Sequence, residues 1–185
     1  MDKRQHILDT ALTLFNQSGY HSVGIDSIIL AAGVAKKTCY RYFPSKSDLI
    51  CEVLEQRLEA CQISLTAFVM PAHTPMARLE RVFDWHAEWF LHPDFFGCMF
   101  ALAAAEFPDR TSRMHIISAR QKRGLIAFVR DLLVPLCSHQ RAEQLAPILV
   151  MLLDGATLAE KILGEKNSAQ EAWKIAAQLL TEPCG

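Results

Sequence analysis

The chain has 185 residues, which is enough for one domain or two small ones with a sizeable buried core. Hydrophobic residues make up 51% of it and charged residues 21%, so the composition is that of an ordered globular protein and excludes a disordered one. The formal net charge of −1 excludes a uniformly basic protein, so any affinity for nucleic acid has to come from a local cluster of Lys and Arg.

Three short helices are predicted before Pro44. The first ends at Gly19, because its apolar residues recur with the helical period up to that point. The second has one apolar face and ends at Gly33, which tolerates the positive φ of a sharp turn. The third cannot continue through Pro44, which lacks an N–H and disfavours helical geometry at the residue before it. Residues 24 to 43 therefore have the pattern of a helix-turn-helix, whose last helix enters the major groove of DNA.

The candidate DNA contacts are polar and basic side chains on the third helix and at the start of the next one. Residues 1 to 50 contain six Lys or Arg and four Asp, and four of the six basic residues lie between Lys36 and Lys46. A lysine on a helix surface is ordinarily a solvated charge, but this concentration within a helix-turn-helix favours contacts to bases and phosphates. Lys46 also begins a helix, where free N–H groups attract a phosphate. The candidates are Arg4, Lys36, Lys37, Thr38, Tyr40, Arg41 and Lys46.

The rest of the chain is predicted to be helical as well, which makes the fold all-α. Ser45 and Asp48 form a capping box that begins a long helix at Lys46, ending near residue 68. Thr74 is a good N-cap, and the proline after it suits a first helical turn. No segment has the convincing alternation of a strand. Further helices are expected at 76–91, 95–106, 110–134, 141–163 and 168–181.

The helix predicted at 141–163 has two apolar stripes, so it has to be covered on two sides. It is either a central core helix or a helix with one stripe on its own core and the other on a second subunit. Small residues such as Gly155 would let another helix approach closely, and the last helix adds a further apolar stripe. The second stripe of 141–163 is Ile148, Met151, Gly155, Leu158 and Ile162. The predicted subunit contacts are Leu145, Leu149, Leu152, Ala156, Ala159, Leu163, Ala169, Trp173, Ala176 and Leu180.

Large apolar side chains are concentrated between Trp85 and Phe100. Trp85 and Trp89 lie on a different helix face from His86 and Phe90, so these rings cannot all enter one ordinary core. Although an aromatic stripe is more often core, an apolar pocket with a few polar anchors is the usual form of a small-molecule site. The candidate pocket residues are Trp85, His86, Trp89, Phe90, Phe96, Met99, Phe100, His115 and Asp154.

The first quarter of the chain resembles the DNA-binding domain of the TetR (tetracycline-repressor) family of bacterial transcriptional regulators. The resemblance rests on Phe15-Asn16-Gln17-Ser18-Gly19-Tyr20, on Ala31-Ala32-Gly33-Val34, and on Tyr40-Arg41-Tyr42-Phe43-Pro44-Ser45-Lys46 with Leu49. It implies that Tyr40 and Lys46 clamp the phosphate backbone and that residues 36 to 38 face the groove. Arg4 and Arg41 are auxiliary backbone contacts. At Gly24 the family usually has Ser or Thr, so a hydroxyl contact to a phosphate is missing here.

The resemblance also implies the domain organisation and the partners. Residues 1–48 are expected to form the DNA-binding domain, and residues 49–185 a helical ligand-sensing and dimerisation domain whose last two helices build a four-helix bundle with a second copy. The expected function is that of a repressor that binds a palindromic operator as a homodimer and is released by an apolar small molecule of unknown identity. The alternative is a protein-interaction module of the same fold without operator binding, which Gly24 and the weak net charge favour.

Enzymatic, metal-dependent and membrane functions are not expected. The sequence has no G-x-G-x-x-G, P-loop, G-x-S-x-G or H-E-x-x-H motif, so no catalytic residue, metal or cofactor is predicted. The most apolar run, from Phe95 to Ala105, is about half the length of a bilayer span. With no signal peptide and no Cys-x-x-Cys pair, the cysteines are expected to be reduced thiols in the cytoplasm. They are Cys39, Cys51, Cys61, Cys98, Cys137 and Cys184.

Overall fold

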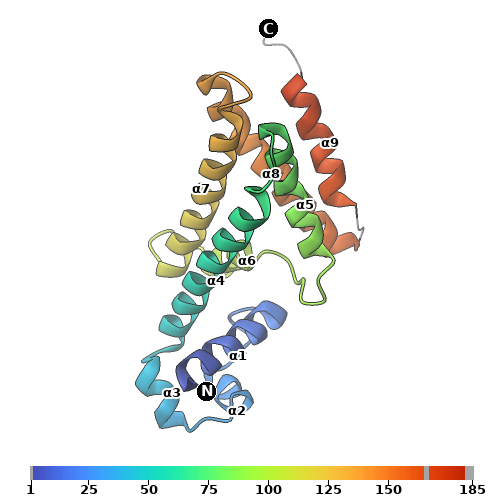
Figure 1. The fold of residues 1–185 in the computed structure, drawn as a ribbon. Helices are drawn as coiled ribbons and strands as arrows, with labels where there is room; N and C mark the ends of the chain where they lie inside the picture. Colours follow the sequence, from blue (N-terminus) through green and yellow to red (C-terminus); the bar gives the residue numbers. More distant parts are fainter. Residues whose placement is uncertain (1, 165–166, 182–185) are drawn as a thin grey trace. The chain divides into compact units, whose positions relative to one another are not determined.

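The computed structural model describes residues 2–164 and 167–181, and this part of the chain forms nine α-helices without a strand (Figure 1). The all-α prediction is therefore confirmed. The helices are α1 (Lys3–Ser18), α2 (Ile25–Ala31), α3 (Lys36–Tyr42), α4 (Lys46–Val69), α5 (Pro75–Phe90), α6 (Met99–Glu106), α7 (Arg113–Leu133), α8 (His139–Leu163) and α9 (Ser168–Thr181).

Local sequence signals place most helix ends as predicted. Gly19 follows α1 with φ of 82°, and Gly33 lies between α2 and α3 with φ of 61°, a backbone region that favours glycine. At the start of α4 the Ser45 hydroxyl oxygen accepts a hydrogen bond from the Asp48 N–H (3.1 Å), as the capping box predicts. Thr74 caps α5 through its side-chain oxygen in the same way. These ends depend on interactions between residues only a few positions apart, which is why the sequence reveals them.

Three helices begin two or more residues away from the predicted positions. Helix α6 begins at Met99 rather than at residue 95, because the backbone bends just before it at Gly97, where φ is 92°. Helix α7 begins at Arg113 rather than at residue 110, because the Asp109 carboxylate accepts the N–H two residues further on (2.8 Å) and holds a turn there. Helix α8 begins two residues earlier than predicted, because Ser138 is its N-cap.

The described residues form two compact units, and the predicted boundary after residue 48 lies inside the first of them. Unit 1 contains the chain up to Ala60 together with Cys98–Gln121, and unit 2 contains Cys61–Gly97 and the described chain from Lys122 onward. The compact units thus differ from the predicted contiguous domains 1–48 and 49–185. The reason is that α6 and the beginnings of α4 and α7 bury apolar side chains in the same core as α1, α2 and α3.

The core of unit 1 brings together aromatic and sulfur-containing side chains from distant parts of the sequence. Phe15, Tyr20 and Phe43 are fully buried in it, and the rings of Phe15 and Tyr20 lie 5.3 Å apart. The Cys51 sulfur of α4 lies 3.5 Å from the Met114 sulfur of α7. Helix α6 and the start of α7 are therefore integral parts of the unit that carries the helix-turn-helix.

In unit 2, α5, α8 and α9 pack on one another (Figure 1). The buried residues of α9 are all alanines, namely Ala169, Ala172 and Ala176, so the helix backbone can approach its neighbours closely. The ring of Phe83 on α5 is fully buried and lies 5.2 Å from the ring of Trp173 on α9. Small side chains on one helix are thus matched by large ones on the next.

The described residues contain neither a disulfide nor a metal cluster. None of the five cysteines among them forms a disulfide, and Cys184 lies outside the described residues. Within the same ranges, no group of three or more His, Cys, Asp or Glu side chains is arranged to hold a metal ion. None of the described helices combines the length and the hydropathy that a membrane span requires.

Candidate functional site

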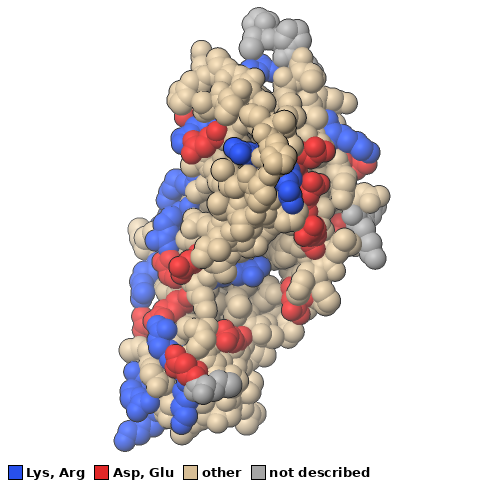
Figure 2. All heavy atoms as spheres, in the orientation of Figure 1, with Lys and Arg blue, Asp and Glu red and all other residues tan. Residues whose placement is uncertain are grey.

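Helix α3 is oriented by two side chains that anchor it in the core of unit 1. Cys39 and Phe43 are fully buried there. Burial raises the pKa of the Cys39 thiol, which keeps it protonated and unreactive. Because about 3.6 residues complete one helical turn, the basic residues of α3 and Tyr40 lie on another side of the helix. This side faces solvent, and Figure 2 shows Lys and Arg gathered over the end of the unit that α3 forms.

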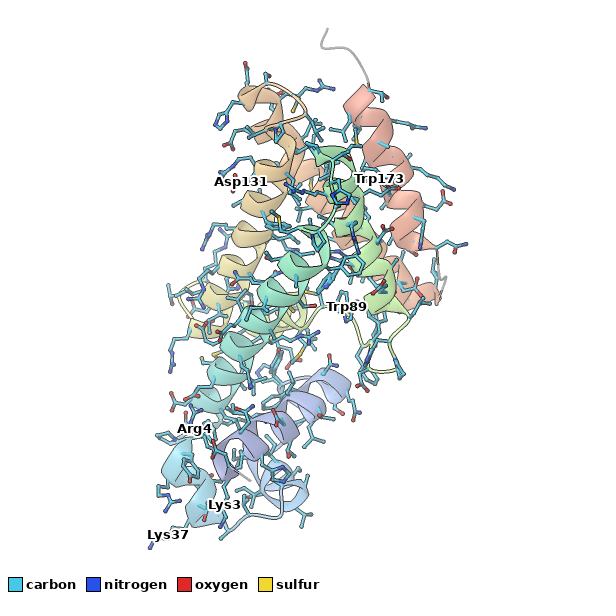
Figure 3. All side chains as sticks on the ribbon, viewed as in Figure 1. Lys3, Arg4, Lys37, Trp89, Asp131 and Trp173 are labelled. Atoms are coloured by element: carbon cyan, nitrogen blue, oxygen red, sulfur yellow. The ribbon has the colours of Figure 1, made fainter. Side chains whose placement is uncertain are left out.

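The two lysines at the start of α3 have different surroundings. The ammonium of Lys36 lies 2.9 Å from a carboxylate oxygen of Asp26 on α2, and this hydrogen bond raises the pKa of Lys36. Asp26 therefore offsets part of the charge with which Lys36 would attract DNA. Lys37 is exposed and has no ion-pair partner within the described ranges, and its side chain extends outward from α3 (Figure 3). Lys37 is the best placed of the predicted contacts.

The remaining polar side chains of α3 are exposed to different degrees. Tyr40 and Arg41 are exposed, whereas Thr38 is half-buried. The guanidinium of Arg41 lies 4.9 Å from the centroid of the Tyr42 ring and donates a hydrogen bond to the Tyr42 hydroxyl oxygen (3.1 Å). Tyr42 is not among the predicted contacts, yet its hydroxyl lies beside one of them. The repeated tyrosine in the Tyr-x-Tyr motif is the sequence signal that could have identified it.

Lys46 and Arg4, which lie outside α3, are engaged to different extents. The ammonium of Lys46 is 3.5 Å from the carbonyl oxygen of His21, a long contact that a phosphate could readily replace. Arg4 forms an ion pair with Glu52 of α4 and lies over the ring of Phe43, 5.4 Å from its centroid. A DNA contact by Arg4 would therefore require this ion pair to break, whereas Lys46 is nearly free to make one.

The N-terminus of α2 lacks the side-chain cap that is usual at this place. Gly24 is the N-cap residue, with φ of −76° and ψ of 151°, and no side chain bonds there. These dihedral angles suit any residue, and a Cβ at Gly24 would meet only the Ser27 hydroxyl, at 3.7 Å. Serine or threonine would thus fit without a clash, so the missing hydroxyl does not follow from a steric constraint.

The predicted effector residues fall into both compact units. Met99, Phe100 and His115 belong to unit 1, where Met99 and Phe100 are part of the core and the His115 Nδ1 lies 3.1 Å from the carbonyl oxygen of Phe107. Each of these three residues serves the packing of unit 1, and their role in an effector pocket stays a prediction. The other predicted residues belong to unit 2.

In unit 2 the predicted aromatic residues cluster around His86. The ring centroids of Trp85, Trp89 and Phe90 lie 5.0, 6.2 and 6.4 Å from that of His86. Phe95, which was not predicted, extends the cluster and lies 4.9 Å from Trp89. It follows the end of α5, in a segment where helical spacing gives no guide to side-chain direction. Four of the predicted pocket residues are therefore neighbours in the structure.

His86 is a neutral hydrogen-bonding group inside this cluster. Its Nδ1 lies 2.7 Å from the carbonyl oxygen of Val82, and because a carbonyl can only accept, Nδ1 carries the hydrogen and Nε2 the lone pair. Burial lowers the pKa of His86 to about 4 and outweighs the opposing effect of the hydrogen bond to Val82. The ring is therefore uncharged near neutral pH and offers an acceptor at Nε2.

Two further predicted pocket residues take part in other contacts. Asp154 on α8 is exposed and forms an ion pair with Lys122 of α7. The ring of Phe96 lies beneath the ammonium of Lys161, 5.3 Å from it. Both residues belong to unit 2. Phe96 is not among the rings that contact His86, whereas the charge of Asp154 acts on His86 and raises its pKa, against the larger effect of burial.

Burial distinguishes the two apolar stripes of α8. Leu145, Leu149 and Ala156 of the first stripe are buried in the core of unit 2, as are Ala169 and Ala176 of α9. These five residues were predicted to contact a second subunit, but within this chain they are already covered by its own helices. Of the other predicted contacts, Leu152, Ala159, Trp173 and Leu180 are half-buried and Leu163 is exposed.

The second stripe of α8 faces solvent. Met151, Leu158 and Ile162 are 62%, 60% and 69% exposed, and Ile148 and Gly155 are exposed beside them. On α9, Ile175 is also exposed. The stripe that is open to a partner is thus the one the sequence did not assign to it.

Comparison with known proteins agrees with the helix-turn-helix geometry. Residues 7–53 match the family model described as bacterial regulatory proteins, tetR family. The chain is 26% identical over 194 residues to the HTH-type transcriptional repressor NemR of Escherichia coli K12, and the match covers 98% of this chain and 96% of that protein. The chain belongs to the TetR family of transcriptional regulators. These regulators bind DNA and are not enzymes.

A TetR-family regulator from Streptomyces coelicolor shows the similarity in structure. The two chains superpose with a TM-score of 0.91 and 29% sequence identity, covering 96% of this chain and 94% of the other. Identity is higher over a shorter stretch: over 54 residues it reaches 48% with the HTH-type transcriptional regulator AcrR of Shigella flexneri. That match covers 29% of this chain and 25% of AcrR.

The buried neutral His86 predicts a loss of stability in mild acid. The folded protein holds this ring unprotonated down to about pH 4, whereas the unfolded chain binds a proton below about pH 6.5. As the pH falls from about 6.5 toward 4, the unfolded state gains a proton that the folded state does not, so the free energy of unfolding should decrease by up to about 1.4 kcal/mol per pH unit.

Urea unfolding at pH 7.5 and pH 5 should show this decrease for the wild type. His86→Asn retains a donor for the Val82 carbonyl but cannot titrate, so its dependence on pH should be smaller. His92→Asn, which changes an exposed histidine in the same unit, is the matched control and should behave as wild type. An identical pH dependence in the wild type and His86→Asn would contradict the assignment.

Proposed function

We propose that this TetR-family protein is a homodimeric repressor that binds a palindromic operator through α3 and leaves it when a small effector binds in unit 2. The observation that carries the proposal is the outward orientation of Lys37 and Tyr40 on a helix whose opposite face is anchored by Cys39 and Phe43. A two-fold dimer would place two such helices on half-sites about one helical turn apart or somewhat more. Residues 1–48 would contact DNA, and the chain after them would sense the effector and dimerise.

The first prediction separates base contacts from phosphate contacts. Lys37→Ala should change the base preference at particular positions of the site and cost about 1–3 kcal/mol, because Lys37 extends outward from the recognition helix. Lys46→Ala should weaken binding to all sequences alike and reduce the salt dependence of the affinity, because a phosphate carries no sequence information. Selection of sites from a random-sequence duplex pool, followed by titration at several salt concentrations, measures both effects.

The exposed lysine Lys174 on α9 supplies the control, since Lys174→Ala changes the net charge equally without altering α3. A Lys37→Ala variant with the wild-type base preference and a uniformly lower affinity would show that Lys37 contacts only phosphate. If the wild type itself selects no sequence, the repressor proposal fails. The interaction-module alternative, which the uncapped Gly24 and the weak net charge favour, would then be preferred.

The homodimer would form through the exposed stripe of α8. Met151, Leu158 and Ile162 lie at intervals of seven and four residues, which places them on one face of the helix. Gly155 lies on the same face, with nothing within 4 Å of the position a Cβ would occupy, so another helix could approach closely there. Ile175 of α9 adds apolar surface from a second helix, and two copies of this helix pair would make a four-helix bundle.

The second prediction tests this stripe. Leu158→Glu should give a folded monomer with poor operator affinity, because it places a carboxylate in the apolar contact between subunits. Leu91→Glu is the matched control, since Leu91 is 61% exposed against 60% for Leu158 and lies at the end of α5. Sedimentation at micromolar concentration should give a dimer for the wild type and Leu91→Glu. A monomeric wild type, or a dimeric Leu158→Glu, would contradict the proposed interface.

The effector site would be built around His86 and its aromatic neighbours. Half-buried Trp85 and Trp89 supply ring faces, and the lone pair on Nε2 of His86 has no hydrogen-bond partner among the described residues. Because the ring is neutral and fixed as an acceptor there, it favours an uncharged molecule that donates a hydrogen bond, such as an aromatic alcohol. The two charged groups that act on this ring, Asp154 and Lys122, form an ion pair with each other, so the site favours an uncharged molecule over a cation or a carboxylate.

The third prediction uses a matched pair of compounds, naphthol and its methyl ether, which differ in the one donor. Naphthol should bind with quenching of tryptophan fluorescence and should weaken operator binding, and the operator should weaken naphthol binding by the same factor. The ether should bind less well to the wild type, and the difference between the two compounds should vanish in His86→Leu. Equal binding of both compounds to the wild type would refute the role of His86.

A further inference from the structure

The turn that follows α1 is fastened to both ends of α6 by hydrogen bonds. The backbone N–H groups of Tyr20 and His21 donate to the two carboxylate oxygens of Glu106, at 3.0 and 2.6 Å. At the other end of the helix, the Tyr20 hydroxyl donates to the carbonyl oxygen of Met99 (3.0 Å). All four residues belong to unit 1, although 85 positions separate His21 from Glu106 in the sequence.

Glu106 is the single charged residue of α6, and it lies at the C-terminal end of the helix, where the helix dipole disfavours a negative charge. The sequence of the helix is MFALAAAE, so the carboxylate lies in the last position, at the negative end of the helix dipole. Its side chain is only 18% exposed, so water screens it little. The two backbone donors of the turn stabilise the charge, and hydrogen bonds to an ionised acceptor are among the stronger ones in proteins. The position of Glu106 is thus determined by the turn rather than by α6.

The close approach of Glu106 to the turn requires a glycine. Gly19 has φ of 82°, and a Cβ there would lie 2.6 Å from the Glu106 Oε1. The contact is completed by rings, because the Phe107 ring lies 5.9 Å from that of Tyr20 and 4.8 Å from that of His21. Burial raises the pKa of Tyr20, so its hydroxyl remains a donor at neutral pH. The turn and the end of α6 therefore form one interlocked contact.

The same turn reaches the candidate DNA-binding surface. The carbonyl oxygen of His21 lies 3.5 Å from the ammonium of Lys46, one of the residues predicted to contact a phosphate. His21 is thus held by the carboxylate of α6 through its N–H and meets the basic side chain of α4 through its C=O. A displacement of α6 that carries Glu106 with it would move the peptide groups next to Lys46.

We propose that Glu106 is a positioning residue for DNA binding, which fixes the turn between α1 and α2 and, through His21, holds Lys46 ready for a phosphate. This inference rests on the proposed DNA-binding function of Lys46. It assigns to the C-terminal end of α6 a specific polar contact with the helix-turn-helix, so that a change in α6 alters operator affinity without any change in the recognition helix itself. Glutamine in place of Glu106 keeps the shape but loses the second acceptor oxygen and the charge.

The experiment is a double-mutant cycle of Glu106→Gln and Lys46→Ala, with the affinity measured on one duplex that the full-length wild type selects from a random pool. Glu106→Gln should weaken binding about fivefold or more, and the double variant should bind no more weakly than Lys46→Ala alone. The amide protons of Tyr20 and His21 should exchange faster in Glu106→Gln than in the wild type. Glu59→Gln, an exposed carboxylate of α4 in the same unit, is the control and should bind as wild type.

Wild-type affinity in Glu106→Gln, or losses that simply multiply in the double variant, would overturn the proposal. If Glu106→Gln does not fold, Glu106→Asp keeps the charge at a shorter reach and should bind DNA more weakly than wild type while the Tyr20 and His21 amides exchange faster. Wild-type affinity in this variant would overturn the proposal equally. A wild type that selects no duplex would instead refute the proposed DNA-binding function, while the amide exchange would still report whether Glu106 holds the turn.

Discussion

The burial of Cys39 and Phe43 determines the direction in which α3 faces, and the DNA-binding surface depends on it. Both side chains are inaccessible to solvent, so any rotation of α3 about its axis would expose an aromatic ring and bury a lysine. The core that holds them also contains residues of α4, α6 and α7. The orientation of the recognition helix is therefore a property of the whole of unit 1 and not of the three short helices alone.

Ion pairs moderate the positive charge at this surface. Asp26 is paired with Lys36 and Glu52 with Arg4, which leaves Lys37 as the α3 lysine without an acidic partner among the described side chains. This arrangement agrees with the net charge of −1, which shows that the chain has no overall excess of basic residues. Affinity for DNA would then come from a few well-placed groups, and the accuracy of their placement would matter more than their number. Contacts that position these groups, such as that of Glu106 with the turn at His21, gain importance for this reason.

In unit 2, burial likewise determines which side of α8 faces solvent, because this helix has two apolar stripes. The stripe that contains Leu149 is covered by other helices of the chain, and the stripe that contains Leu158 is open. An exposed apolar stripe along a helix is costly for an isolated chain, and this cost is the reason for proposing that a second copy covers it. Burial lowers the pKa of His86, which should reduce the stability of the folded chain in acid. The same burial keeps the ring a neutral hydrogen-bond acceptor among aromatic rings.

The sequence by itself determined the all-α class, the helix-turn-helix and most helix ends, because each depends on residues a few positions apart. Gly19, Gly33 and the hydrogen bond between Ser45 and Asp48 are such local signals. The family resemblance was equally local, since it rested on motifs within the first 50 residues.

Only the tertiary structure decided which stripe of α8 is buried, because the two stripes are equally apolar and differ only in what packs against them. It likewise decided that Met99 and Phe100 complete the core of the unit carrying the helix-turn-helix, and that Arg4 is paired with Glu52. The contact of Glu106 with His21 belongs to the same class. It spans 85 positions and joins one carboxylate to two backbone N–H groups and to the ring of His21, so the folded chain alone reveals it.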